Sequence, residues 1–190
     1  LKEIATKIDI LNNEFIKIHN YNPIEHVTSR IKSSESIVKK LKRHGLEVNM
    51  DNMQNCLSDI AGIRIVCSFT SDIYLIADMI SKQNDLTILA RRDYMKNPKK
   101  SGYRSYHMLV TTPVSLSDSI IDTKVEIQIR TVAQDFWATL EHKMHYKFEG
   151  DGPDYITKEL RECARYVAEL DARMEELNNE IQKYGKKNPL

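Results

Sequence analysis

The chain has 190 residues, of which 41% are apolar, and its 28 Lys and Arg residues almost balance its 27 Asp and Glu residues, for a formal net charge of +1. This length and composition fit one domain with an ordinary hydrophobic core. The charge balance argues against a broad electrostatic surface for DNA or a membrane, so any anion site must be a local cluster of cations.

The first 45 residues carry helical signals. Apolar residues recur at steps of three and four, which predicts one helix with a narrow apolar seam: Leu1, Ile4, Ile8, Leu11, Phe15 and Ile18. Asn22 then suits an N-cap and Pro23 a first helical position, which predicts a second helical region that ends near Gly45.

The middle of the chain alternates in the manner of strands. Period-two patterning predicts strands in four stretches: 59–69 (DIAGIRIVCSF), 85–95 (DLTILARRDYM), 103–114 (YRSYHMLVTTPV) and 124–131 (KVEIQIRT). A helix follows Thr70–Asp72, with four apolar residues on one face: Ile73, Ile76, Ala77 and Ile80. Residues 132–148 (VAQDFWATLEHKMHYKF) predict a further helix.

The C-terminal part predicts one long helix beyond residues 150–153 (GDGP). Its apolar residues follow a heptad spacing: Leu160, Cys163, Val167, Leu170, Met174, Leu177, Ile181 and Tyr184. We therefore expect an α+β fold with a mixed sheet flanked by helices and with helical extensions at both termini. The expected organisation is an N-terminal helix (1–22), a central domain (23–150) and a C-terminal oligomerisation helix (151–190).

The cysteines and the absence of targeting signals indicate the compartment. The three cysteines lie far apart without a CxxC pair, and the sequence has neither a signal peptide nor an apolar run long enough for a membrane span: Cys56, Cys67 and Cys163. We expect reduced thiols in a cytoplasmic protein.

Alternation in the strand predicted for 124–131 places a carboxylate, an amide and a guanidinium on one face of the strand. The ordinary explanation for Glu126, Gln128 and Arg130 is a solvated strand face. The alternative is the floor of a cleft, with Glu126 as metal ligand or general base. Asp59 offers a second carboxylate at the entry of another strand, and two carboxylates can hold Mg²⁺ for phosphate chemistry. Gly62 predicts a bulge or a close backbone approach.

Rings and cations gather behind the basic turn 97–100 (NPKK). Alternation puts Tyr103, Ser105 and His107 on one face of the expected strand, with Arg104 and Tyr106 on the other. Tyr103 can lie flat against a purine, and His107 can reach the phosphates of the same nucleotide. The alternative is that the tyrosines pack as half-buried rings, which suits Tyr106.

Three blocks together, DIAGIR, RDYMKNPKKSGYRSYH and VEIQIRT…FWATLEHKMHYK, resemble the RelA/SpoT-type alarmone synthetase domain, over roughly Pro23 to Lys147. The short chain resembles the small synthetases of the RelP/RelQ kind. The resemblance implies a nucleotidyltransferase-like sheet and a cytoplasmic homotetramer that acts in the stringent response. The implied reaction transfers pyrophosphate from ATP to the 3′-hydroxyl of GDP or GTP, which gives AMP and (p)ppGpp.

The resemblance also implies roles for single residues. Asp59 and Glu126 match the residues that hold Mg²⁺, and Glu126 also matches the residue that helps to deprotonate the 3′-hydroxyl. The implied ATP contacts are an adenine-sandwiching pair, Arg30 and Arg64, and the phosphate-binding residues Lys32, Ser36 and Lys40.

On the acceptor side, Tyr103 matches a tyrosine that stacks on guanine. The residues expected near the phosphates of GDP or GTP are Arg92, Lys99 and His107. Gln128 matches a position near the metal and the acceptor.

The sequence departs from the RelQ pattern at two positions. His26 and Asp135 stand where product-activated RelQ proteins have an aromatic residue and an Asn, and a carboxylate sits poorly beside a polyphosphate. We therefore expect RelP-like behaviour without strong product activation.

Two alternative functions stay open from the sequence. One is a toxic relative that makes (p)ppApp or pyrophosphorylates tRNA, and the other is a non-catalytic module that binds single-stranded RNA through Tyr103 and the basic turn. A regulatory single-stranded RNA is a further expected partner.

Overall fold

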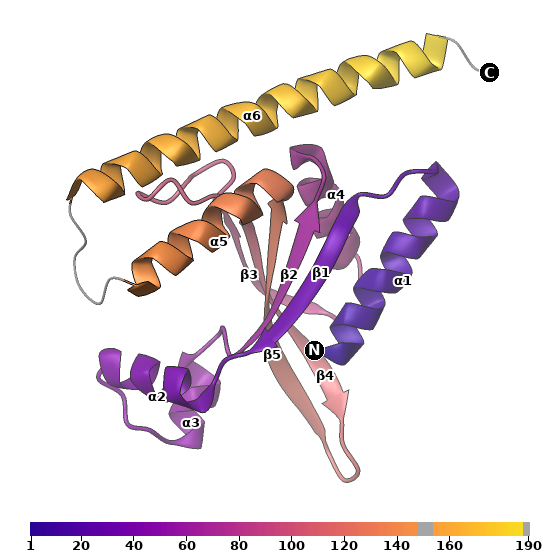
Figure 1. The fold of residues 1–190 in the computed structure, drawn as a ribbon. Coiled ribbons are helices and arrows are strands. Elements are labelled where there is room, and N and C mark those ends of the chain that lie inside the picture. The colour runs from indigo at the N-terminus through magenta and orange to yellow at the C-terminus, as the bar shows by residue number, and fades with distance from the viewer. Residues whose placement is uncertain (148–153, 188–190) are drawn as a thin grey trace.

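The computed structural model describes residues 1–147 and 154–187 and has one mixed five-stranded sheet with helices on it (Figure 1). The strand order is β1-β2-β5-β4-β3, with β2 and β5 parallel and the other neighbours antiparallel. The strands are β1 (Ile24–Ile31), β2 (Ala61–Cys67), β3 (Thr87–Asp93), β4 (Tyr106–Ser115) and β5 (Ile120–Thr131). The expected α+β class is confirmed.

Six helices frame the sheet in the described part of the chain. They are α1 (Lys2–His19), α2 (Ser34–Arg43), α3 (Met50–Cys56), α4 (Thr70–Ser81), α5 (Val132–Lys147) and α6 (Asp154–Lys187). Figure 1 shows α6 crossing over α5 at one end of the sheet, while α2 and α3 form a pair at the other end. The expected domain boundary at 150/151 lies outside the described residues. None of the helices within the described ranges has the length and apolarity needed to span a membrane.

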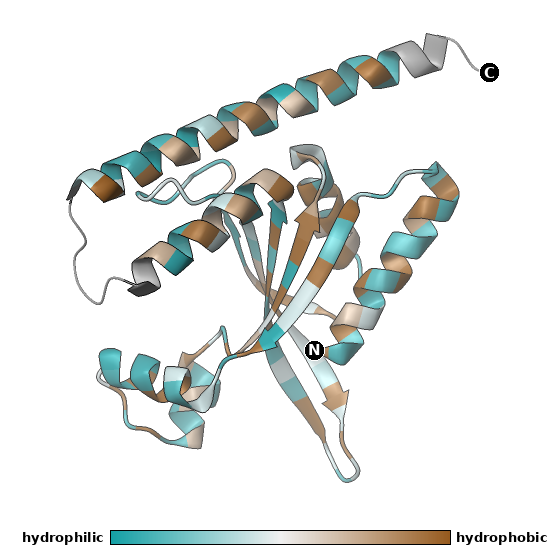
Figure 2. Ribbon diagram, in the orientation of Figure 1, coloured by the Kyte–Doolittle hydropathy of each residue, from teal (hydrophilic) through white to brown (hydrophobic). Residues whose placement is uncertain are grey.

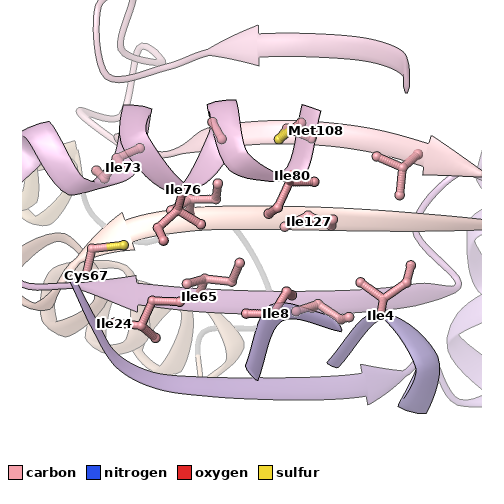
Figure 3. Packing of buried hydrophobic residues seen from close by; sticks show 14 of the residues in the cluster. Ile4, Ile8, Ile24, Ile65, Cys67, Ile73, Ile76, Ile80, Met108 and Ile127 are labelled. Carbon is pink, nitrogen blue, oxygen red and sulfur yellow. The ribbon is translucent and has the colours of Figure 1, made fainter. Parts of the chain in front are cut away.

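The core lies between one face of the sheet and helices α1 and α4 (Figure 3). The apolar face predicted for residues 70–81 is buried as expected, and it packs on alternate residues of the central strands. Ile4 and Ile8 of α1 enter the same core, so the N-terminal apolar seam covers the sheet. Figure 2 shows brown apolar bands alternating with teal polar residues along the strands. This alternation leaves the opposite face of the sheet free for polar side chains.

The second helical region predicted from residue 22 to Gly45 is partly wrong. Residues Ile24–Ile31 form β1, which pairs antiparallel with β2, and the helix α2 begins only at Ser34. β-branched side chains at Ile24, Val27 and Ile31 suit a strand, and pairing with β2 outweighs the local cap signal. Gly45 follows the helix at φ 69°, as a C′ glycine does. Arg30 therefore lies on the sheet.

The strand predicted for 103–114 begins three residues later, at Tyr106. Tyr103 lies in the turn before β4, where Gly102 has φ 93° and its N–H donates to the carbonyl of Lys99 at 2.8 Å. The β1–β2 irregularity falls between Ile24 and His26, so no bulge occurs at Gly62 in the pairing of these strands. Tyr106 packs edge-on against Tyr74, with ring centroids 5.8 Å apart, as the half-buried reading expected.

Candidate active site

The polar face of the sheet carries two rows of side chains that cross its strands. The first row contains Thr28 and, in the same register, four of the expected donor and acceptor residues: Arg64, Gln128, His107 and Arg92. The second row lies two residues away from the first on each strand, toward the end of β1 and the beginning of β2 and β5. It contains Arg30, Gly62 and Glu126. Residues from five strands thus converge because paired strands hold equivalent positions side by side.

One cavity of about 150 Å³ lies over β1 and β2, and its lining includes Arg30, Asp59, Arg64, Glu126 and Gln128. Gly62 forms part of its floor. A Cβ added at Gly62 would meet no atom of the described protein closer than 3.9 Å, so the protein itself does not require glycine there. A missing side chain at this point leaves space for a ligand.

Asp59 stands at the edge of this cavity between two lysines. Lys32 and Lys40 lie 2.5 and 2.8 Å from its carboxylate oxygens. Burial alone would raise the pKa of Asp59, but the two ammonium groups outweigh it and hold the pKa below its ordinary value. The carboxylate is therefore ionised at neutral pH. Ser36 lies one helical turn before Lys40 on α2, where it is exposed.

Glu126 lies between two cavities. A second cavity, over β3 and β4, is lined by Arg92, His107 and Glu126 among others. Burial by itself raises the pKa of Glu126, but hydrogen bonds from His107 and Gln128 outweigh it and keep the pKa below the usual glutamate value. Its two oxygens lie 3.2 Å from His107 Nδ1 and 2.9 Å from Gln128 Nε2. This face of the strand therefore lines cavities and is not an open solvated face, while the role of Glu126 as metal ligand or general base stays a prediction.

Tyr103 lies in the turn before β4 and contacts His107, which lines the second cavity. Its hydroxyl lies 2.9 Å from His107 Nε2, and Tyr94 packs edge-on against both rings. Lys99 Nζ lies 4.7 Å from the centroid of the Tyr103 ring. The turn thus brings a ring and a cation to the same place, as the sequence pattern predicted.

Two contributors were not assigned to this site from the sequence. Arg130 is 4% exposed and donates to the Tyr103 hydroxyl and to Gln128 Oε1, at 2.7 Å each. Asp135 pairs with both Arg130 and Arg64 at 3.2 Å. The alternation of β5 already placed Arg130 beside Gln128, so the signal was available. His26, the other residue of the expected product-site departure, is exposed on β1.

Burial lowers the pKa of Arg64, and so does the neighbouring Arg130, while the carboxylate of Asp135 acts in the opposite direction. A guanidinium still keeps its charge at neutral pH. The cavity therefore presents two cationic, planar groups, Arg30 and Arg64, from neighbouring strands.

Known proteins resemble this chain in both sequence and fold. The family profile described as "Region found in RelA / SpoT proteins" matches residues 29–151. GTP pyrophosphokinase YwaC of Bacillus subtilis is 46% identical over 181 residues, which cover 95% of this chain and 86% of that protein. The crystal structure of small alarmone synthetase 1 from B. subtilis bound to its product pppGpp superposes with a TM-score of 0.88 at 35% identity, over 95% of this chain and 92% of that one. The same protein bound to AMPCPP gives a TM-score of 0.81 at 33% identity, over 96% and 91% of the two chains.

Proposed function

The chain belongs to the RelA/SpoT family, and from that premise we propose that the two cavities around Glu126 carry its reaction. It is a small alarmone synthetase, a GTP pyrophosphokinase that makes (p)ppGpp. The two relatives are named for GTP pyrophosphokinase activity. This argues against both alternatives, the toxic synthetase and the RNA-binding module.

The donor site lies over β1 and β2. Arg30 and Arg64 hold adenine between their guanidinium planes, because arginine stacks on aromatic rings while keeping its charge. Lys32 and Lys40 bind the ATP phosphates with help from Ser36. Their present pairing with Asp59 supports this assignment, since Asp59 lines the same cavity as Glu126 and the pairing places both ammonium groups at the edge of that cavity.

The acceptor site lies over β3 and β4. Tyr103 stacks on guanine, and the phosphates of GDP or GTP are bound by two cations, Arg92 and Lys99, together with the imidazole of His107. Gln128 supports the reacting end of the acceptor through its hydrogen bond to Glu126. A local cluster of this kind is what the nearly neutral net charge required.

Mg²⁺ is the expected cofactor, and the donor set fits it. Asp59 and Glu126 line one cavity, and both carboxylates have lowered pKa values, so both are anionic at neutral pH. Mg²⁺ prefers one or two carboxylates together with water and substrate phosphates. Bound there, the ion would offset the charge of two polyphosphates.

The single observation that carries the proposal is that Glu126 lines both cavities. The 3′-hydroxyl oxygen of the acceptor attacks the β-phosphorus of ATP, and the bond to the bridging oxygen between the α- and β-phosphorus breaks, so AMP leaves. Glu126 accepts the hydroxyl proton. Holding the two nucleotides on either side of one carboxylate supplies much of the acceleration by orientation.

The test is incubation with ATP, Mg²⁺ and either GDP or GTP, followed by chromatographic identification of the products. We expect AMP and ppGpp or pppGpp in equal amounts. ATP and tRNA offered as competing acceptors should give little product. Absence of AMP, or a preference for those acceptors, would contradict the proposal.

The remaining assignments concern assembly and regulation. We propose a homotetramer built partly on the C-terminal segment 151–190, with residues 23–150 as the catalytic domain. Weak product activation follows if Asp135, which pairs with two arginines, repels a polyphosphate. Regulation by single-stranded RNA stays a prediction, which competition between RNA and GTP would test.

A further inference from the structure

We propose that Arg130 is a positioning residue. It fixes the side chains of Tyr103 and Glu126 relative to Arg64 of the donor site. The inference rests on the proposed roles of those three residues. It concerns a side chain that the sequence analysis assigned no part in the reaction.

Arg130 is buried where a charge is costly. It is 4% exposed, on β5, on the same face as Glu126 and Gln128. A buried guanidinium is tolerated only when carboxylates or hydrogen-bond acceptors compensate it. The identity of its partners therefore indicates its purpose.

Two hydrogen-bond paths run from Arg130 to the two oxygens of Glu126. In the first, Arg130 donates to the Tyr103 hydroxyl, the hydroxyl faces His107 Nε2 at 2.9 Å, and His107 Nδ1 faces Glu126 Oε1 at 3.2 Å. In the second, Arg130 donates to Gln128 Oε1, and Gln128 Nε2 donates to Glu126 Oε2 at 2.9 Å.

These paths agree in direction. A neutral His107 with its proton on Nδ1 accepts from the Tyr103 hydroxyl and donates to Glu126, so each group in the first path donates toward the carboxylate. The second path has the same direction. Glu126 is thus oriented from both sides by groups that Arg130 orders, and hydrogen bonds in such chains reinforce one another.

The third partner connects Arg130 to the donor site. Asp135, in the first turn of α5, lies 3.2 Å from Nη1 of both Arg130 and Arg64. One carboxylate therefore fixes the guanidinium proposed to stack on adenine and the guanidinium that orders the acceptor ring. Arg64 and Arg130 thus share one anchor, and Arg64 keeps its own contact with Asp135 when Arg130 is replaced.

Lysine cannot make this set of contacts. The planar guanidinium directs separate N–H groups at Tyr103, Gln128 and Asp135, and its Cζ lies 5.0 Å from the centroid of the Tyr103 ring. An ammonium is a compact point charge on a flexible stem, without that fixed fork. Arg130→Lys therefore keeps the charge and removes the positioning.

The experiment measures binding of each nucleotide alone, where no transfer can occur. Calorimetry with Mg²⁺ gives the Kd of GDP without ATP and the Kd of ATP without GDP, for the wild type, Arg130→Lys and Arg130→Met. We expect both variants to bind GDP about tenfold or more weakly, the scale of one charge-assisted hydrogen bond. ATP should weaken less than threefold, and kcat should fall with the rise in the acceptor KM.

The matched control is Arg91→Lys. Arg91 neighbours the acceptor residue Arg92 on β3, but it is exposed and donates to Ser81 of α4. We expect unchanged GDP binding there. Tyr103→Phe adds a specific readout: with the hydroxyl gone, Arg130→Lys should cost less GDP affinity than it does in the wild-type background.

Unchanged GDP affinity in folded Arg130→Lys would overturn the proposal. Additive losses in the double variant with Tyr103→Phe would also overturn the link through the hydroxyl. If Arg130→Met fails to fold, Asp135→Asn takes its place, with weaker binding of both nucleotides expected. Failure of the wild type to make alarmone from ATP and GDP would instead contradict the proposed function, which these binding measurements do not require.

Discussion

The carboxylate of Glu126 is held as an anion by its neighbours. Hydrogen bonds from His107 and Gln128 outweigh burial and keep its pKa below the ordinary value. A carboxylate with a low pKa is a weak base toward a free hydroxyl, because efficient proton transfer favours a base whose pKa lies near the working pH. In the proposed reaction, Glu126 would therefore serve as a fixed negative charge for Mg²⁺ and would accept the proton only as the O–P bond forms.

Glu126→Gln should abolish most synthesis while leaving the fold intact. The substitution keeps the size of the side chain but removes the negative charge and the proton acceptor. We expect a loss of at least about 100-fold in kcat, the low end for loss of a general base. Product chromatography measures the rate, and circular dichroism checks the fold. Glu14→Gln, on an exposed position of α1, is the control. Near-normal turnover in Glu126→Gln would remove Glu126 from the reaction.

Tyr103→Ala should weaken GDP or GTP binding by about 1–3 kcal/mol, the usual scale of a base stacked on an aromatic ring. ATP binding should change little. Tyr103→Phe separates the ring from the hydroxyl and should retain the stacking part of the affinity. Calorimetry with each nucleotide alone measures both. A loss of ATP affinity with GTP affinity intact would mean that the two sites are reversed.

At the scale of elements, the pattern of apolar residues in the sequence predicted most of the fold. Val125, Ile127 and Ile129 alternate with polar residues, and β5 covers the predicted stretch 124–131 but begins four residues earlier, at Ile120. β1 was missed because Asn22 and Pro23 are genuine helix-start signals, and pairing with β2, distant in sequence, decided the outcome. Local propensity cannot represent such a long-range partner.

The sequence predicted which residues form the candidate site, but it did not predict the ion pairs and packing contacts that connect them. Strand alternation and the family resemblance brought Glu126, Tyr103 and His107 together. The double pairing of Asp135 depends on where α5 begins relative to β2, a distance no sequence pattern encodes. The same holds for the contact between α6 and the turn that carries Tyr103.

Gly102→Ala should pull that turn away from α6. Gly102 has φ 93°, and an added Cβ would lie 2.5 Å from Cβ of Ala164, which is too close. Overpacking typically costs about 1–3 kcal/mol, and the turn must shift with Tyr103. We expect lower stability in denaturant and weaker GDP binding. Gly45→Ala is the control, since Gly45 has φ 69° but nothing within 4 Å, so only backbone strain applies there.

Partial recovery of GDP binding in Gly102→Ala combined with Ala164→Gly would identify the contact as the cause. If Gly102→Ala bound GDP like the wild type, the position of the turn would not depend on α6.

We expect the buried carboxylate of Asp171 to make the docking of α6 depend on pH. Its carboxylate accepts hydrogen bonds from Thr131 and Gln134 at 2.7 and 3.0 Å, yet burial outweighs them and raises its pKa. The folded protein thus holds this proton more tightly than the unfolded chain does. The contribution of Asp171 to the free energy of unfolding is therefore largest below the unfolded pKa of about 3.9 and falls as pH rises through the folded pKa.

Asp171→Asn should remove this pH dependence. The amide can accept the same hydrogen bonds without a buried charge, so the variant should gain stability relative to the wild type as pH rises from about 4 to about 8. Denaturant unfolding across that range measures the difference. Asp122→Asn, at an exposed position of β5, is the control. A difference that stays constant with pH would show that Asp171 does not titrate as inferred.

For the whole molecule, the long helix extends an apolar seam that the described residues 1–147 and 154–187 do not cover. Leu170, Met174, Leu177 and Ile181 are 55, 48, 46 and 67% exposed, although α6 docks on the body through Ala164 and Asp171. The side chain of Tyr184, the last residue of the predicted seam, lies outside the described residues. Because α1 packs on the sheet, it does not supply the missing cover.

Leu170→Glu combined with Leu177→Glu should therefore break an oligomer without touching a substrate contact. Each change puts a charge where apolar side chains would meet across an interface, and burying an unpaired carboxylate costs several kcal/mol. Because α6 also supports the Tyr103 turn through Ala164, we expect activity to fall as the oligomer dissociates. Light scattering measures the mass of the wild type and of the variant, with Glu180→Gln on the same helix as control. A wild-type mass near that of one 22.1 kDa chain at micromolar concentration would contradict the proposed assembly.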